Sequence, residues 1–284
     1  MPTVAYLGPE KTNTYFAARK EFGEKGKYIH APTVEDVFRL VEREKADFGV
    51  VPVENSLEGS VTRTLDRFTN FKNSLAKVFG EIDLPIQHHF ITRRGADRKK
   101  IEIVYSHPQA LGQCGEWLGK NVPRATRLQE TSSTAEAIEA LLRDNLLWEP
   151  EEQAAIGRRE LAMEHGLAAV PIPVSQENRT RFLVLSLKTP KRRKKNKTSL
   201  MFALKDKPGA LHDALMPFKH NRINLTKIES RPSKRRAWEY VFFVDLEGHE
   251  SEPRVKKALR ELERQTAQYR VLGSYPWGGS HGRG

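Results

Sequence analysis

Short apolar runs alternate with amphipathic segments along the first part of the chain. Strands are predicted at 3–8, 28–31 and 48–55, and helices at 12–22, 33–43 and 59–68. In the second helix Val34, Val37 and Val41 fall on one face, as burial against a sheet requires. Because each helix links one strand to the next, the pattern predicts an α/β fold with a largely parallel sheet.

A long extended stretch at 80–92 interrupts this order. Apolar runs at 101–106, 124–128 and 154–157 then resume it, and each is followed by a segment of helical periodicity. Two α/β lobes fit this arrangement better than one continuous sheet. We therefore predict a two-lobed domain over residues 1–187.

The order of elements changes after residue 198. Strands are predicted at 199–205, 223–230, 237–246 and 269–276, and helices at 208–220 and 252–265. In the second helix Val255, Ala258 and Leu262 recur at helical spacing, which gives one face to lay on an antiparallel sheet. The βαββαβ order predicts a ferredoxin-like α+β domain over 198–276, a plausible independent module, followed by a flexible tail at 277–284.

The net charge of +12 on the 284-residue chain is mostly local. The segment 188–197, KTPKRRKKNK, contains seven basic residues and no acid. Such a run is typical of a solvated linker between domains, with a tether for polyanions as the alternative. A nucleic-acid-binding protein is therefore not expected.

The sequence carries no sign of membrane insertion or export. No stretch approaches the ~18 apolar residues of a membrane span, and the N-terminus lacks the pattern of a secretory signal. We expect a cytoplasmic protein that does not act on membranes. The lone cysteine, Cys114, argues against an intramolecular disulfide and a cysteine-rich zinc site.

Hydroxyl, amide and carboxylate side chains gather where the strands of the first domain are predicted to end. They are Thr12 and Thr14, Glu54, Asn55 and Ser56, Ser106 with Gln109, and Ser133 with Glu136. The last two pairs have capping-box spacing, so each alone is explained by a helix cap. Together they predict a pocket for a small anion lined with neutral donors, because ligands bind open α/β sheets at strand ends.

The motifs of several enzyme classes are missing. The sequence contains no glycine-rich nucleotide motif, no paired carboxylates and no cluster of metal ligands, so neither a cofactor nor a metal is expected. His88 and His89 lie in an apolar run, which favours structural histidines over a catalytic base.

Seven segments, in this order, closely resemble the prephenate dehydratases. They are VAYLGPE (4–10), GVVPVENSLEGSV (49–61), GEIDLPIQHHF (80–90), YSHPQALGQC (105–114), SSTAEA (132–137), AAIG (154–157) and NRTRFLVL (178–185). GALH (209–212) and ESRP (229–232) match the phenylalanine-binding motifs of the ACT domain that commonly follows this enzyme. The resemblance implies two lobes of the type II periplasmic-binding-protein kind and a ferredoxin-like ACT domain.

The resemblance also implies a reaction, the decarboxylative dehydration of prephenate to phenylpyruvate in L-phenylalanine biosynthesis, without a cofactor. Thr180 is expected to donate to the leaving hydroxyl, and catalytic contributions are expected from Asn55, Ser106 and Gln113. Substrate-binding residues are expected to be Thr12, Thr14, Ser56, Ser133, Thr134, Arg181 and Phe182. Because strand side chains alternate, Arg181 should point away from Thr180, as an ion-pair anchor; in an irregular turn it would instead meet a substrate carboxylate.

For regulation, the resemblance implies that phenylalanine binds the ACT domain between subunits of a homodimer or homotetramer and favours a less active state. The binding residues are expected to be Gly209, Ala210, Leu211, His212, Asn224, Glu229, Ser230, Arg231 and Pro232. Two alternatives stay open: arogenate dehydratase, which performs the same elimination on the amino analogue, and a two-lobed small-molecule binding protein without catalysis.

The first motif departs from the family pattern. Lys11 stands where a glycine is usual, and Asn13 stands where an aromatic residue is usual. Glycine permits a positive φ at little cost, so Lys11 implies a changed or strained turn. The segment 144–153, DNLLWEPEEQ, is also atypical, and its sequence assigns it no role.

Overall fold

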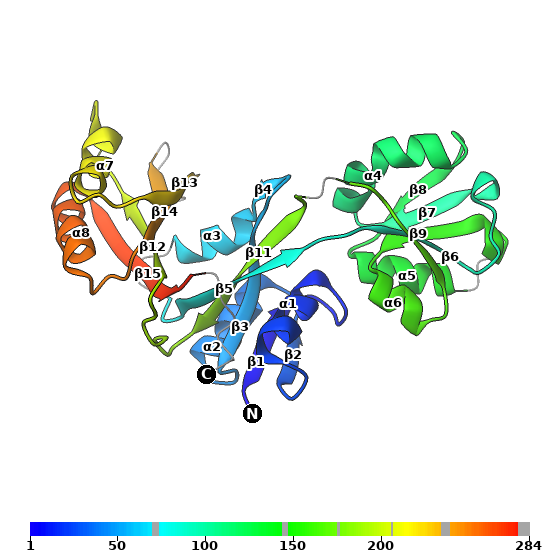
Figure 1. Ribbon diagram of the computed structural model, residues 1–284, viewed down its shortest axis with the longest axis horizontal. Coiled ribbons are helices and arrows are strands. Elements are labelled where there is room, and N and C mark those ends of the chain that lie inside the picture. The colour runs from blue at the N-terminus through cyan, green and yellow to red at the C-terminus, as the bar shows by residue number, and fades with distance from the viewer. Residues whose placement is uncertain (70–73, 144–146, 175–176, 206, 234–238, 278–284) are drawn as a thin grey trace. The chain divides into compact units, whose positions relative to one another are not determined.

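The computed structural model describes residues 1–69, 74–143, 147–174, 177–205, 207–233 and 239–277 (Figure 1). The chain forms two compact units. Unit 1 combines Met1–Gly8, Ala17–Asp83 and Arg181–Gly284, and unit 2 combines Pro9–Phe16 with Leu84–Thr180. None of the helices in the described ranges is long and apolar enough to cross a membrane.

Unit 1 contains the first lobe of the predicted pair, called lobe 1 below. Its strands are β1 (Thr3–Leu7), β2 (Lys27–Ala31), β3 (Phe48–Asn55), β4 (Gly59–Ser60), β5 (Lys77–Pro85) and β11 (Arg179–Ser186). Its helices are α1 (Asn13–Phe22), whose first four residues belong to unit 2, α2 (Val34–Glu42) and α3 (Thr62–Phe68). The sheet has the order β2-β1-β3-β11-β5, with β4 paired to β3, and β1 runs parallel to both β2 and β3.

Helix α2 shows how local sequence and packing agree in lobe 1. Thr33 caps the helix, since its Oγ1 accepts a hydrogen bond from the backbone N of Asp36 at 3.1 Å. Val37 and Val41 pack on β3 at Gly49, where an added Cβ would lie 2.9 Å from each of them. The apolar stripe seen in the sequence is therefore the face that lies on the sheet.

Unit 2 contains the second lobe, with a mixed sheet. Its strands are β6 (His89–Thr92), β7 (Ile103–Ser106), β8 (Arg127–Glu130), β9 (Gln153–Gly157) and β10 (Ala168–Pro171). Its helices are α4 (Pro108–Asn121), α5 (Thr134–Leu142), α6 (Arg159–Glu164) and the 3-10 turns η1 (Arg98–Lys100) and η2 (Pro150–Glu152). The strand order is β10-β6-β9-β7-β8.

The sheet of unit 2 mixes parallel and antiparallel strands. Strand β7 runs parallel to β8 and β9, but β6 runs antiparallel to both β9 and β10. Strand β6 enters from the extended stretch that follows β5 rather than from a helix. It is therefore not held to the parallel direction that a helical crossover imposes on consecutive strands.

The C-terminal domain has the predicted ferredoxin-like fold. Its elements are β12 (Asn196–Ala203), α7 (Ala210–His220), β13 (Leu225–Pro232), β14 (Tyr240–Glu247), α8 (Pro253–Gln265) and β15 (Gln268–Pro276). The strands form an antiparallel sheet in the order β13-β14-β12-β15, with α7 and α8 on one face (Figure 1).

The other face of the C-terminal sheet shares a hydrophobic core with lobe 1. Side chains alternate along β12, so Leu200 and Phe202 pack with α7 and α8, whereas Met201 joins the core of lobe 1. The other C-terminal residues in that shared core are Ala203, Val241, Phe243, Leu272 and Tyr275. Lobe 1 therefore covers one apolar face of the C-terminal sheet.

The basic linker is shorter than predicted. Asn196 and Lys197 already belong to β12, and the Lys197 side chain is only 6% exposed, with its Nζ 2.8 Å from Glu81. The predicted tail at 277–284 lies outside the described residues except for Trp277, whose ring centroid is 5.1 Å from Lys197 Nζ. Lys197 is thus buried, unlike the solvated basic residues before it, because Glu81 of lobe 1 pairs with its ammonium group.

Candidate functional site

Gln113, on α4, is held in place by two other side chains of unit 2. Its Oε1 accepts a hydrogen bond from Asn178 Nδ2 at 2.9 Å and lies 2.9 Å from Nε2 of His88. A carbonyl oxygen only accepts hydrogen bonds, so His88 carries a proton on Nε2. Asn178 is 2% exposed, and its backbone oxygen accepts from Ile86 N at 2.9 Å. The amide of Gln113 is therefore fixed in one orientation.

His88 and Asn178 are candidate functional residues that the sequence reasoning did not place in the site. Both stand inside the family segments at 80–90 and 178–185, and this is the sequence signal that points to them. The apolar run predicts a structural histidine at position 88, and the structure pairs this histidine with a candidate catalytic residue, Gln113.

Ser106 ends strand β7 and is completely buried. Its Oγ donates a hydrogen bond to the backbone oxygen of Ile156 at 2.9 Å. The expected capping of α4 by Ser106 is wrong: the N-cap is His107, whose Nδ1 accepts from Gln109 N at 3.2 Å. Because β9 engages the serine hydroxyl, this geometry supports a role in fixing the end of β7.

Ser133 caps helix α5 as the spacing predicted. Its Oγ accepts from the backbone N of Glu136 at 3.0 Å. The carboxylate of Glu136 accepts hydrogen bonds from the hydroxyl and backbone N of Ser132, which lower the pKa of Glu136. Thr134 is half-buried in the first turn of the same helix.

The two hydroxyls of the first motif stand where α1 begins. Thr12 Oγ1 donates to the backbone oxygen of Pro9 at 3.1 Å, which closes the turn before the helix. Thr14 is only 6% exposed.

The two departures from the family motif both form contacts within unit 2. Lys11 has φ = 63°, the left-handed conformation that its place in a glycine position implied, and its Nζ pairs with Glu164. Asn13 Oδ1 accepts from Nη1 of Arg158 at 3.1 Å. Both substitutions therefore add polar contacts from this turn to α6 and the residue that precedes it.

In unit 1, Asn55 ends β3 and shapes the turn that follows. Its Oδ1 accepts from the backbone N of Leu57 at 3.0 Å and of Glu58 at 3.2 Å, and the residue is 6% exposed. This Asx-type turn fixes the side-chain amide. Ser56 is exposed within the same turn.

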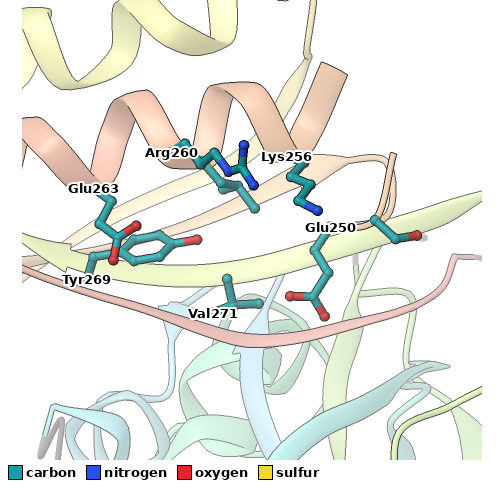
Figure 2. A pocket seen from close by; sticks show the side chains of 8 residues that line it. Glu250, Lys256, Arg260, Glu263, Tyr269 and Val271 are labelled. Atoms are coloured by element: carbon teal, nitrogen blue, oxygen red, sulfur yellow. The ribbon is translucent and has the colours of Figure 1, made fainter. Parts of the chain in front are cut away.

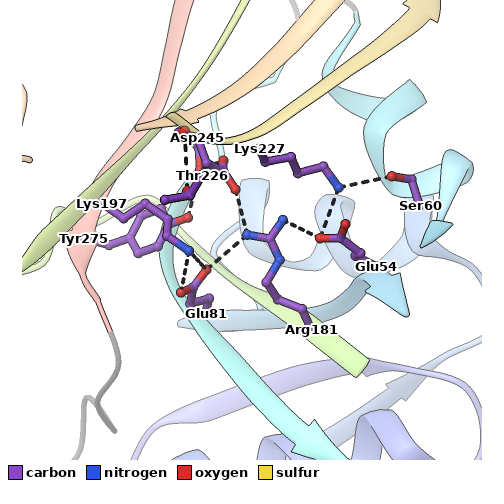
Figure 3. A network of polar contacts seen from close by, with 10 residues as sticks. Glu54, Ser60, Glu81, Arg181, Lys197, Thr226, Lys227, Asp245 and Tyr275 are labelled. Carbon is purple, nitrogen blue, oxygen red and sulfur yellow. Dashed lines mark hydrogen bonds and ion pairs between the residues drawn. The ribbon is translucent and has the colours of Figure 1, made fainter. Parts of the chain in front are cut away.

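Strand β11 carries Thr180, Arg181 and Phe182. Phe182 is 1% exposed, and Thr180 is half-buried. The guanidinium of Arg181 lies 2.6 Å from Asp245 and 2.8 Å from Glu54 (Figure 3). Burial alone would lower the pKa of Arg181, but Asp245 and its neighbours more than offset burial and raise this pKa. Of the two roles left open for Arg181, the geometry supports the ion-pair anchor.

The two motifs of the C-terminal domain stand at the start of α7 and the end of β13. Gly209 is the N-cap of α7 with φ = 77°, a conformation that favours glycine, and Leu211 packs on the domain core. Asn224 Nδ2 donates to Glu247 at 2.9 Å. Arg231 Nη2 lies 3.3 Å from Asp66 on α3 of lobe 1.

A pocket of about 370 Å³ lies elsewhere in this domain, between α8 and β15 (Figure 2). It is lined by Glu250, Ser251, Lys256, Leu259, Arg260, Glu263, Tyr269 and Val271. Burial raises the pKa of Tyr269, and the nearby carboxylates act in the same direction, so its hydroxyl stays protonated. The pocket contains none of the motif residues at 209–212 or 229–232, since β15 and β13 are opposite edges of the sheet.

Within the described ranges, no three His, Cys, Asp or Glu side chains are grouped so that they could hold a metal ion. Cys114 lies in the core of unit 2, and burial raises the pKa of its thiol to about 12.

The atypical segment 144–153 closes part of the core of unit 2. Trp148 packs against that core, and its ring lies 5.9 Å from the guanidinium of Arg127. Gln153 Nε2 donates to the backbone oxygen of Trp148 at 3.1 Å. Residues 144–146 lie outside the described part of the chain.

Comparison with known proteins connects these residues to a family. The family model for prephenate dehydratase matches residues 4–190, and the ACT domain model matches residues 198–264. The chain belongs to the prephenate dehydratase family. The resemblance drawn from its motifs is therefore confirmed, together with the order of a prephenate dehydratase domain followed by an ACT domain.

Relatives within the family match over most of the chain. A bifunctional chorismate mutase/prephenate dehydratase of Aquifex aeolicus is 48% identical, over 96% of this chain and 73% of the relative. A prephenate dehydratase of Methanocaldococcus jannaschii is 38% identical over 88% of each. The crystal structure of prephenate dehydratase from Arthrobacter aurescens in complex with L-Phe aligns with a TM-score of 0.85 and 32% identity, covering 96% of this chain and 89% of that one.

Proposed function

We propose that the protein converts prephenate to phenylpyruvate, carbon dioxide and water. The observation that carries this proposal is the family match over residues 4–190, a range that contains every candidate catalytic residue. The relatives named as prephenate dehydratases support it over nearly the full chain.

The chemistry needs hydrogen-bond donors more than a strong base. When the ring carboxylate leaves as carbon dioxide, its bonding electron pair enters the ring, and the bond to the ring hydroxyl breaks. The departing oxygen then takes up one proton and leaves as water. A preorganised donor aimed at that oxygen stabilises the transition state because the negative charge develops there.

We assign this donor role to Thr180, near the start of β11. Gln113 and Asn55 act as fixed amides, the first held by Asn178 and His88 and the second by its own turn. Ser106 acts from the end of β7. Thr12, Thr14, Ser56, Ser133, Thr134 and Phe182 complete the proposed substrate-binding set. Fixed donors need little reorganisation during the reaction, which is the reason such sites accelerate it.

We further propose that L-phenylalanine binds the ACT domain and lowers turnover. The start of α7 supports this assignment, because the N-terminus of the helix at Gly209 is the positive end of its dipole, which suits an amino-acid carboxylate. The solved relative in complex with L-Phe supports the choice of effector. The proposal includes the homodimer or homotetramer and the cytoplasmic location expected from the sequence.

The test is phenylpyruvate formation by the purified full chain in cofactor-free buffer with a metal chelator, with and without phenylalanine. Turnover that phenylalanine suppresses would support both parts of the proposal. Turnover on arogenate but not prephenate would move the assignment to the amino analogue. Binding of prephenate without turnover would refute catalysis and leave a two-lobed binding protein.

A further inference from the structure

Six charged side chains form one network where the C-terminal sheet packs on lobe 1 (Figure 3). They are the cations Arg181, Lys197 and Lys227 and the carboxylates Glu54, Glu81 and Asp245. Arg181 is the centre of the network: its Nη1 lies 2.6 Å from Asp245 and 3.3 Å from Glu81, and its Nη2 lies 2.8 Å from Glu54. The three positive and three negative charges balance.

The network is attached to two candidate catalytic residues. Arg181 directly follows Thr180 on β11, and Glu54 directly precedes Asn55 on β3. The ACT domain supplies an ion-pair partner for both Arg181 and Glu54. Asp245 on β14 pairs with Arg181, and Lys227 on β13 lies 3.2 Å from Glu54.

The ACT side chains of the network have little freedom to move. The side chains of Asp245 and Lys227 are 10% and 9% exposed. Ser199 Oγ donates to Asp245 Oδ1 at 2.6 Å, and Lys227 Nζ donates to Ser60 Oγ at 3.0 Å. Charges held this way, away from water, transmit a displacement of one partner to the other, because an unpaired buried charge is costly.

We propose that Asp245 and Lys227 are positioning residues for the dehydratase reaction, through which the ACT domain sets the placement of Thr180 and Asn55. The inference rests on the proposed function. It also gives the effector a route, because Lys227 and Glu229 are two residues apart on β13 and point to the same face of the sheet. A ligand that shifts the motif at 229–232 shifts the Lys227 ammonium on the same strand.

The test measures kcat and KM for phenylpyruvate formation in Asp245→Asn and Lys227→Met, with phenylalanine affinity measured separately by calorimetry. Each variant is expected to lose about tenfold in kcat with KM within about twofold of wild type. Phenylalanine should still bind Asp245→Asn but should inhibit it less than wild type. A purely structural role would not separate binding of the effector from inhibition.

The matched control is Asp66→Asn, which removes an ion pair between the same two parts of unit 1. Asp66 meets Arg231 at 3.3 Å, but it lies on α3, which carries no candidate catalytic residue. Its kcat should stay within about twofold of wild type. An equal loss of kcat in the control, or variants as active and as inhibited as wild type, would overturn the inference. If Asp245→Asn does not fold, Lys227→Met decides by the same criteria; an inactive wild type would refute the proposed function itself.

Discussion

Replacing Gly273 with alanine should destabilise the protein, although glycine is normally a poor residue inside a strand. Gly273 lies on β15 against the backbone of β5, and a Cβ built there would stand 2.0 Å from the oxygen, 2.9 Å from the carbon and 3.1 Å from the nitrogen of Val78. All three atoms belong to the main chain of β5, an edge strand of the lobe 1 sheet. A side-chain rotation therefore cannot relieve the clash.

The size of the effect follows from the displacement that the methyl group requires. Ordinary contacts of a Cβ begin near 3.4 Å, and the oxygen stands at 2.0 Å, so β15 must retreat from β5 by roughly 1.4 Å. Overpacking of this kind costs about 1–3 kcal/mol, and a gap wider than about 1 Å forfeits about half of the dispersion energy of the contacts that it opens. We expect a loss of about 3 kcal/mol, which corresponds to roughly 6–12 °C in the melting temperature of a chain this size.

The assay is thermal and urea unfolding of the full chain, with Gly119→Ala as the matched control. Gly119 lies on α4 with nothing within 4 Å of an added Cβ, so the same substitution should stabilise that helix by about 0.5–1 kcal/mol. The two substitutions should therefore shift the midpoint in opposite directions. A Gly273→Ala protein that melts at or above the wild-type temperature would refute the packing of β15 on β5.

Three further predictions concern the site, the linker and pH. Thr180→Ala should lower turnover at least ~100-fold, the loss typical of removing one preorganised donor, while Thr180→Ser should keep much of the activity. Replacing the basic residues of 191–195 with Gly and Ser should leave turnover unchanged, whereas Lys197→Met should destabilise the fold by about 3 kcal/mol because it strips Glu81 of a buried partner. Burial lowers the pKa of His89 below its ordinary value of 6.5. As the pH falls, His89 therefore binds a proton in the unfolded chain before it does so in the folded one, and the free energy of unfolding should fall as the pH drops below 6.5. His89→Gln should make this fall less steep.

Each of these predictions has an outcome that contradicts it. Near-normal turnover in Thr180→Ala would remove this threonine from the mechanism. Loss of turnover in a folded linker variant would show that 191–195 does more than connect the domains. A pH profile of the melting temperature that is unchanged in His89→Gln would mean that other groups cause the loss of stability in acid.

The sequence predicted the parts of this structure that depend on neighbours along the chain. Periodicity located α2 and α8, and capping spacing identified Ser133. The sequence did not predict contacts with residues far away along the chain. Ser106 has the spacing of a helix cap, but its hydroxyl donates a hydrogen bond to the backbone oxygen of Ile156 on another strand. Alternation indicates a strand but not its direction, which is why the antiparallel β6 was not foreseen.

The Arg181 network shows the same limit within the candidate site. Its carboxylates stand 127, 100 and 64 positions away along the chain, so no local pattern could have brought them together. Strand alternation did predict that Arg181 would point away from the face of Phe182. Alternation could not predict that the C-terminal sheet lies on that side and places Asp245 next to Arg181.

The discontinuous build of unit 1 has a consequence for how the protein is made. Unit 2 is almost one continuous stretch, so it can fold soon after residue 180 leaves the ribosome. Lobe 1 must wait, because β11 fits between β3 and β5 and the last part of the shared core is translated with β15. A message cut short after residue 190 would thus yield a chain with a bare apolar face, a substrate for chaperones and proteases. Removing the regulatory domain would therefore expose the apolar face of lobe 1 that its sheet covers.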